Sequence, residues 1–296
     1  MKQDRDIKKN PIAIAAFLVP GLLVFGFLVL KPIFEAFIMS TRMWTTITNV
    51  KFVGLDNYIS LFQSSDFWNS VKVSLIYMFG TTTIQVIIGF SLGYFLYLQL
   101  KGYKFFRTVL FAPATLLTVG VGFMWEFVFS PRLGIWRHFL QAIGLGHLYA
   151  PLLGNPDTAL WVVILVHAWR FSGITIILFN SSFQNMPMSV LEMAEIDGAS
   201  GFRKLIHILI PLSLETSKTI LTLTMIGALR AFDLVYAMTG GGPMGGTEVL
   251  PMKMFSEAFQ NFNIGMGAAV AVLIFILAMG MTAIINQFKK DDGVEY

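Results

Sequence analysis

Residues 189–201 have the sequence SVLEMAEIDGASG, a polar stretch between two long apolar runs. Pro187 interrupts the apolar run that precedes it. Ser189, with Glu192 three residues later, has the spacing of a capping box, in which side chains and backbone donors satisfy each other at a helix start. Gly201 is a natural residue for a helix end. We therefore predict a short helix that begins at Ser189.

A second short helix is predicted after this bend. Apolar residues recur there at helical spacing, at Phe202, Leu205, Ile206 and Leu209. Pro211 is expected to end the second helix, because the residue before a proline disfavours the helical conformation. The connector 186–211 is thus predicted to contain two short helices that meet where small residues allow another backbone to approach.

The composition is that of an integral membrane protein. Hydrophobic residues make up 55% of the 296 residues and charged residues 13%, with a mean hydropathy of +0.69. The chain has no cysteine, so it offers no disulfide and no thiolate metal site. No basic tract with interleaved aromatic residues lies outside the apolar runs, so the sequence does not predict binding to nucleic acid.

Six apolar runs each approach the ~20 residues that a helix needs to cross a bilayer. They lie at about 11–39, 71–98, 105–129, 158–183, 215–238 and 264–288. The first run is predicted to be a spanning helix rather than a cleaved signal peptide, because it is long and no convincing cleavage site follows it. The sequence predicts an all-α protein with one transmembrane domain over 1–296 and six transmembrane helices.

The distribution of Lys and Arg predicts the orientation of these helices. If the N-terminus lies inside, six of these residues fall in the outer loops: Arg42, Lys51, Lys72, Arg132, Arg137 and Lys253. Twelve fall on the inner side: Lys2, Arg5, Lys8, Lys9, Lys101, Lys104, Arg107, Arg203, Lys204, Lys218, Lys289 and Lys290. Both termini and the connector 186–211 are therefore predicted to be cytoplasmic.

The fourth run contains polar residues at membrane depth, where charged groups usually face a cavity or a partner. His167 and Arg170 are three residues apart, beside Trp169 and Phe171. We predict that these four residues, together with Thr224 on the fifth run, line a pathway for a polar solute. The alternative for Arg170 is an ion pair with a carboxylate on a neighbouring helix.

Two features of the fifth run also carry predictions. Arg230 and Asp233 are three residues apart, so an ion pair within one helix is expected to offset the cost of their burial. The run is followed by TGGGP, and Gly241, Gly242 and Pro243 are expected to form a tight irregular turn, because glycine tolerates positive φ and proline fixes the exit.

The connector resembles the cytoplasmic EAA loop of binding-protein-dependent ABC importer permeases. Glu192, Ala194, Gly198, Ile208 and Pro211 fall where that loop has its E-A-A, G and I-x-L-P residues, and Asp197, Gly198 and Ala199 match its central D-G-A. Met193 and Ile210 depart from the pattern by apolar exchanges. The resemblance implies that the loop is a coupling helix that docks onto an ATP-binding subunit. The resemblance further implies that Glu192 makes an ionic contact with that subunit and that Gly198 and Ala199 allow its close approach. Asp197 would set the local geometry of the helix and turn.

The stretch 232–243, with Phe-Asp followed by T-x-G-G-P, is similar to the carbohydrate branch of the same family, the maltose and glycerol-3-phosphate permease type. This resemblance implies a sugar or oligosaccharide substrate and a bacterial or archaeal cell membrane. The implied partners are a second, non-identical permease, two ATP-binding subunits and an extracytoplasmic solute-binding protein. ATP and Mg would be held by the ATP-binding subunits, and this chain would bind no cofactor.

The sequence lacks the motifs for hydrolysis of ATP and for zinc-dependent hydrolysis. It has no G-x-x-x-x-G-K-[ST] loop for ATP phosphates and no H-E-x-x-H metal motif. No catalytic or metal-binding residue is predicted. Two other functions remain open at this point. One is an ion-coupled secondary transporter or channel, for which Asp233 is the best acid; the other is a membrane scaffold that does not transport.

Overall fold

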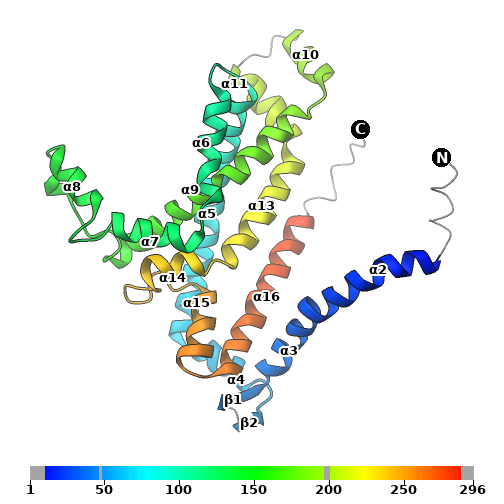
Figure 1. The fold of residues 1–296 in the computed structure, drawn as a ribbon, viewed down its shortest axis with the longest axis vertical. Helices are drawn as coiled ribbons and strands as arrows, with labels where there is room; N and C mark the ends of the chain where they lie inside the picture. Colours follow the sequence, from blue (N-terminus) through cyan, green and yellow to red (C-terminus); the bar gives the residue numbers. More distant parts are fainter. Residues whose placement is uncertain (1–10, 47–48, 197–200, 288–296) are drawn as a thin grey trace. The chain divides into compact units, whose positions relative to one another are not determined.

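The computed structural model of the chain describes residues 11–46, 49–196 and 201–287, and these are mostly helical (Figure 1). The chain divides into two compact units, Met1–Gln63 with Met254–Leu273, and Ser64–Lys253 with Ile274–Tyr296. The elements of the described residues are α2 (Pro11–Phe25), η1 (Gly26–Leu30), α3 (Lys31–Ser40), β1 (Arg42–Thr46), β2 (Asn49–Phe52), α4 (Asp56–Gln63), α5 (Ser65–Tyr97), α6 (Tyr103–Thr115), α7 (Thr118–Val128), α8 (Ile135–Ala142), η2 (Gly146–Leu148), α9 (Pro156–Gln184), α10 (Met188–Ile196), α11 (Gly201–Lys204), η3 (Leu205–Leu209), α12 (Ile210–Leu212), α13 (Leu214–Leu229), α14 (Asp233–Thr239), α15 (Leu250–Phe255), η4 (Ser256–Gln260) and α16 (Ile264–Gln287).

The first unit joins an N-terminal helical segment to a two-stranded hairpin. α2, η1 and α3 follow one another without interruption, and β1 pairs antiparallel with β2, with Arg42 opposite Phe52. Asn57 of α4 ties the two parts together, because its side-chain amide donates to the carbonyls of Ser40 (2.8 Å) and Arg42 (3.0 Å). These two bonds satisfy carbonyls at the point where α3 ends and the hairpin begins.

Four of the predicted spans are single helical segments long and apolar enough to cross a membrane: Ile14–Ser40, Ser65–Tyr97, Pro156–Gln184 and Ile264–Gln287. The other two are bent pairs. α6 and α7 meet at 97°, and α13 and α14 at 48°. The described helices therefore supply four spans, or up to six if each bent pair is one span. The predicted spans over 105–129 and 215–238 are thus each divided by a bend, which the sequence analysis did not predict.

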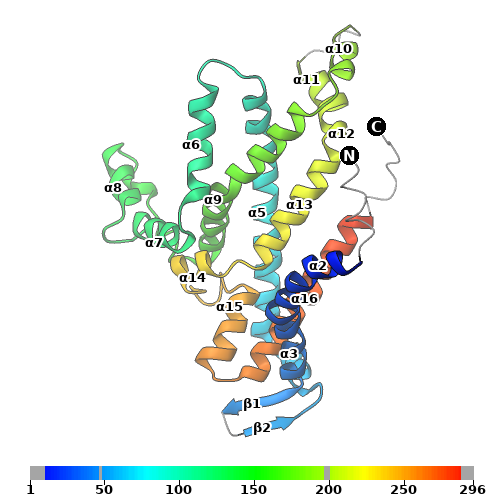
Figure 2. The ribbon, with the colours of Figure 1, turned by 45° about the vertical axis from the view of Figure 1, so that its right-hand side comes forward.

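Glycines allow α5 and α9 to pack closely in the second unit. A Cβ atom at Gly89 would lie 2.8 Å from the Cβ of Thr175. One at Gly93 would lie 2.9 Å from the Cβ of Phe179 and 3.0 Å from the Ile176 carbonyl oxygen. Spanning helices commonly approach each other through such small residues. Figures 1 and 2 both show α5, α9 and α13 side by side.

Gly93→Val is expected to destabilise this helix pair, because the added side chain would meet backbone atoms that cannot move independently of α9. Overpacking of this kind costs about 1–3 kcal/mol. The measurement is the apparent melting temperature of the detergent-solubilised protein. Gly280→Val is the matched control, since a Cβ at Gly280 of α16 has no neighbour within 4 Å. An equal fall in both variants would contradict the close approach.

The connector joins α9 to α13 with a different course from the predicted one. Pro211 does not end the second helix: α11, the π-helical turn η3 and α12 continue to Leu212. In this wide turn the N–H of Ile210 donates to the carbonyl of Leu205, five residues back. Pro211 then occupies the second position of α12, where its missing N–H leaves no donor unsatisfied. Leu209 of η3 is fully buried in an apolar cluster with Phe179 and other residues of α9 and α13.

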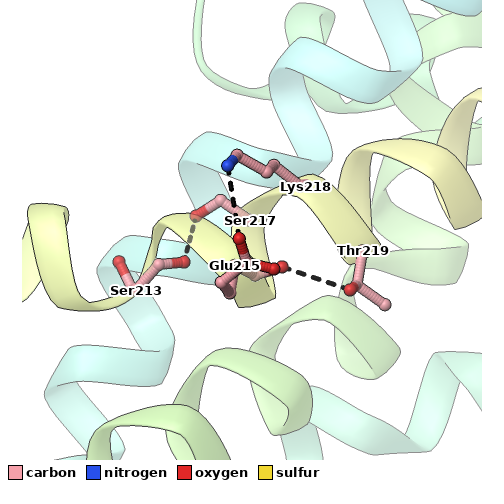
Figure 3. Close-up of polar contacts among 5 residues, drawn as sticks. All are labelled: Ser213, Glu215, Ser217, Lys218 and Thr219. Carbon is pink, nitrogen blue, oxygen red and sulfur yellow. Dashed lines mark hydrogen bonds and ion pairs between the residues drawn. The ribbon is translucent and has the colours of Figure 1, made fainter. Parts of the chain in front are cut away.

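The first turn of α13 neutralises its own charges (Figure 3). Lys218 Nζ lies 3.3 Å from Glu215 Oε1, and the Lys218 side chain is 16% exposed. The hydroxyls of Ser217 and Thr219 donate to the carbonyls of Ser213 (2.9 Å) and Glu215 (3.1 Å), as shown in the same view. One ion pair and two bonds from side-chain hydroxyls to backbone carbonyls therefore form within this helix start.

Candidate functional site

α9 carries a buried polar cluster near its middle. His167 is 5% exposed, and its Nδ1 lies 2.7 Å from the hydroxyl of Tyr77, which is fully buried on α5. The centroid of the His167 ring is 4.7 Å from that of Phe171. Because Tyr77 engages Nδ1, Nε2 is the ring nitrogen that remains for another partner. Tyr77 was not predicted as a site residue. A tyrosine within an apolar run does not indicate which residue its hydroxyl contacts, and His167 is 90 residues away.

A cavity of about 240 Å³ lies beside this cluster, lined by residues of α5, α9 and α13. Its polar lining consists of Gln85, His167, Thr175 and Thr224, and Phe171 supplies an aromatic face. The remaining lining is mostly aliphatic. The structure therefore brings together His167, Phe171 and Thr224, three of the residues predicted for a solute pathway, and adds Gln85 and Thr175 to them.

A second cavity of about 140 Å³ adjoins the first, because both are lined by His167, Phe171 and Gly227. Its lining also includes Arg230 and Asp233, which lie at the break between α13 and α14. The break exposes both charged residues. The polar surface at His167 thus continues past the end of α13.

Trp169 lies away from these two cavities. Its ring makes an edge contact with that of Trp125 of α7, with centroids 5.5 Å apart. Both tryptophans line a separate, apolar groove of about 750 Å³ with Trp136 of α8. Residues two apart on a helix are rotated by about 200°, so Trp169 faces a different direction from His167.

Arg170 lies at neither cavity and binds backbone instead. Its Nη1 donates to the carbonyl of Ala114 (2.7 Å) and its Nη2 to that of Leu116. These carbonyls belong to the end of α6, next to the 97° break, where no helical partner exists for them. The guanidinium also lies 4.7 Å from the centroid of the Phe171 ring. Among the described residues Arg170 forms no ion pair, so the alternative of a carboxylate partner is not supported.

The predicted ion pair between Arg230 and Asp233 is not formed in the part of the chain that the structure describes. α13 ends at Leu229 and α14 begins at Asp233, so the two residues do not share one helix. The i,i+3 rule fails here because it presupposes a continuous helix.

The connector presents a helix with exposed residues. α10 begins at Met188, one residue before the predicted N-cap, and Glu192 on it is exposed. Asp197, Gly198 and Ala199, which carry the D-G-A match, lie outside the described residues, and for Ala194 only the helical backbone is described. Pro211 lies in α12, as given above.

The glycine-rich turn after α14 is fixed to the start of α5. Gly240 and Gly241 have φ of 58° and 91°, which favours glycine, and Gly242 precedes Pro243. The side-chain amide of Asn69 donates to the Gly245 carbonyl (2.9 Å), and the N–H of Leu250 donates to Ser74 Oγ (2.7 Å). The turn is therefore a rigid part of the second unit.

Comparison with known proteins agrees with this architecture. The family described as "Binding-protein-dependent transport system inner membrane component" matches residues 85–290. The chain is 33% identical to the probable ABC transporter permease protein YurN of Bacillus subtilis, over 96% of this chain and 98% of the relative. It is 29% identical to the trehalose/maltose transport system permease protein MalF of Thermococcus litoralis, over 93% of each chain.

A solved structure shares the fold. It is a bacterial ABC transporter involved in the import of the acidic polysaccharide alginate, with a TM-score of 0.80 at 19% identity, over 99% of this chain and 100% of that one. The residues described here include no group of three or more His, Asp and Glu that could hold a metal ion. The family match spans more than half of the chain, and the relative in Bacillus subtilis matches nearly all of it. The chain therefore belongs to the binding-protein-dependent transport system inner membrane components, and it is a membrane-spanning permease subunit of an ABC transporter, not an enzyme.

Proposed function

We propose that this chain forms one half of the path by which an ATP-driven importer moves a sugar or oligosaccharide across a bacterial or archaeal cell membrane. The observation that carries the proposal is the partly open cavity between α5, α9 and α13. Hydroxyl, amide and imidazole groups lie there beside the ring of Phe171, and sugars offer both hydroxyls and an apolar face. The trehalose/maltose permease among the relatives supports the same class of solute.

We also propose that the connector around α10 couples this path to ATP hydrolysis on two partner subunits. Glu192 is exposed on α10, and the connector continues through η3 and α12 into α13, one of the helices that line the cavity. A displacement of α10 can therefore be transmitted along the connector to α13. In this proposal a second, non-identical permease completes the path, and an extracytoplasmic binding protein delivers the solute.

The test begins with gentle detergent extraction of the chain from its native membrane and mass spectrometry of what co-purifies. We expect an ATP-binding subunit with a P-loop and a second permease. The recovered complex is then reconstituted into vesicles with its binding protein, and uptake of radiolabelled maltose and trehalose is measured with and without ATP. ATP-dependent uptake of one of these sugars is the expected result.

Recovery of the chain alone, or uptake that persists without ATP, would contradict the proposal and favour an ion-coupled transporter. The structure gives that alternative little support. Asp233, the acid it depends on, is exposed at a helix break rather than enclosed in a spanning helix. A proton or sodium carrier needs an acid poised within the membrane.

A further inference from the structure

The side chain of Gln85 is buried at the cavity without a partner for its amide nitrogen. The residue is 2% exposed, and among the described residues no hydrogen-bond acceptor reaches Nε2. A buried amide that makes no hydrogen bond costs free energy, so native structures rarely keep one without a function. Gln85 lines the same cavity as His167 and Thr224.

The backbone around Gln85 is held firmly. The hydroxyl of Thr175 on α9 donates to the Gln85 carbonyl at 3.1 Å, and Gly89, one turn along α5, packs against the same threonine. The nearby hydroxyl of Thr81 is occupied by its own helix, donating to the carbonyl of Tyr77 at 2.7 Å. The backbone that carries the Gln85 side chain is thus fixed before any solute arrives, and only the rotation of the side chain is left to be lost on binding.

The cavity carries no fixed charge. Its lining has one ionisable residue, His167, whose Nδ1 already bonds to Tyr77. Arg170, the nearest cation along α9, is occupied by the carbonyls of Ala114 and Leu116. Within this cavity a phosphate or carboxylate would find no cationic side chain, because Arg230 lines only the adjoining cavity, whereas hydroxyl groups would find donors and acceptors.

Resting on the import function proposed above, we propose that Gln85 is a specificity-determining residue whose amide donates a hydrogen bond to an oxygen of a neutral, hydroxyl-bearing solute. The opposing side of the solute is met by His167 Nε2 and Thr224, and its apolar face by Phe171. The cavity selects uncharged sugar units over their anionic counterparts.

The test compares Gln85→Met with the wild type in the reconstituted complex, with saturating binding protein and maltose, trehalose and maltobionate as labelled probes. Maltobionate is maltose with a carboxylate. We expect the wild type to transport a neutral disaccharide at least about tenfold faster than maltobionate. Gln85→Met should transport that disaccharide about tenfold more slowly, which is the size of effect expected for the loss of one hydrogen bond. Its melting temperature should stay unchanged or rise, because the unpaired buried amide is gone.

Gln184→Met is the control. Gln184 lies at the end of α9, and its side-chain amide already donates to Asn180 Oδ1 at 3.0 Å. The Gln184→Met variant should lower the melting temperature slightly and leave uptake unchanged. A lower melting temperature with full uptake in Gln85→Met, or a wild type that prefers maltobionate, would overturn the inference. A wild type that transports none of the probes with ATP would instead refute the proposed sugar import on which it rests.

Discussion

Gly198→Asp is expected to abolish ATP-dependent uptake while the chain still inserts into the membrane. The expectation comes from the resemblance of the connector to a docking loop in which this position is a small residue against the ATP-binding subunit; Gly198 itself lies outside the described residues. An unpaired charge buried in an interface costs about 3–5 kcal/mol. At about 1.4 kcal/mol per tenfold, the affinity for that subunit should fall by more than about 100-fold. Vesicle uptake and the yield of co-purified ATP-binding subunit measure the effect.

The control for this prediction is Lys101→Asp. Lys101 is exposed in the turn between α5 and α6, on the predicted cytoplasmic side, and lies outside the loop resemblance. The Lys101→Asp variant should retain normal uptake and should still co-purify with the ATP-binding subunit. Glu192→Gln removes one charge from the exposed face of α10 and should lower uptake by a smaller factor, since an exposed ion pair is worth about 0.2–1 kcal/mol. Normal uptake by Gly198→Asp, or equal losses in Gly198→Asp and Lys101→Asp, would refute docking at this loop.

The main helices could be predicted from the sequence because hydropathy is a local property. Each of the six apolar runs corresponds to a spanning helix or a bent helix pair. Hydropathy does not predict the 97° break in the third run, because Leu116 and Leu117 at the break are themselves apolar. The partner of this break also lies far away in the sequence: Arg170, more than 50 residues later, donates to carbonyls that the break leaves open.

The candidate site was predicted in part. His167 and Phe171, four residues apart, do share a face of α9 at the cavity, as helical spacing requires. Trp169 could have been assigned to another face by the same geometry. Gln85 could not be recognised, because together with the threonines at 81–83 it equally suits hydrogen bonds between helices. Only the packing of α5 against α9 reveals that the Gln85 amide has no partner within the described residues.

Arg170→Met is expected to lower the stability of the permease by several kcal/mol. Arg170 is 6% exposed and donates to two carbonyls at the end of α6, where the helix dipole also favours a cation. Inside a spanning segment no water replaces these donors. A carbonyl left unsatisfied costs up to about 1–3 kcal/mol when it is fully buried, and these two are partly buried. The melting temperature of the purified complex should fall by several degrees, and α6 and α7 should become more accessible to protease.

Two variants separate this structural role from a role in binding solute. Arg170→Lys keeps the charge but cannot reach both carbonyls in the fork geometry of a guanidinium, so it should recover only part of the lost stability. Arg230→Met removes the same charge from an exposed position at the second cavity and should leave the melting temperature unchanged. If Arg170→Met instead kept its stability and lost the transport of one solute only, Arg170 would be a ligand. Arg170 donates to the carbonyls of Ala114 and Leu116. We therefore expect the 97° break, and with it the position of α7 relative to α6, to depend on the Arg170 side chain.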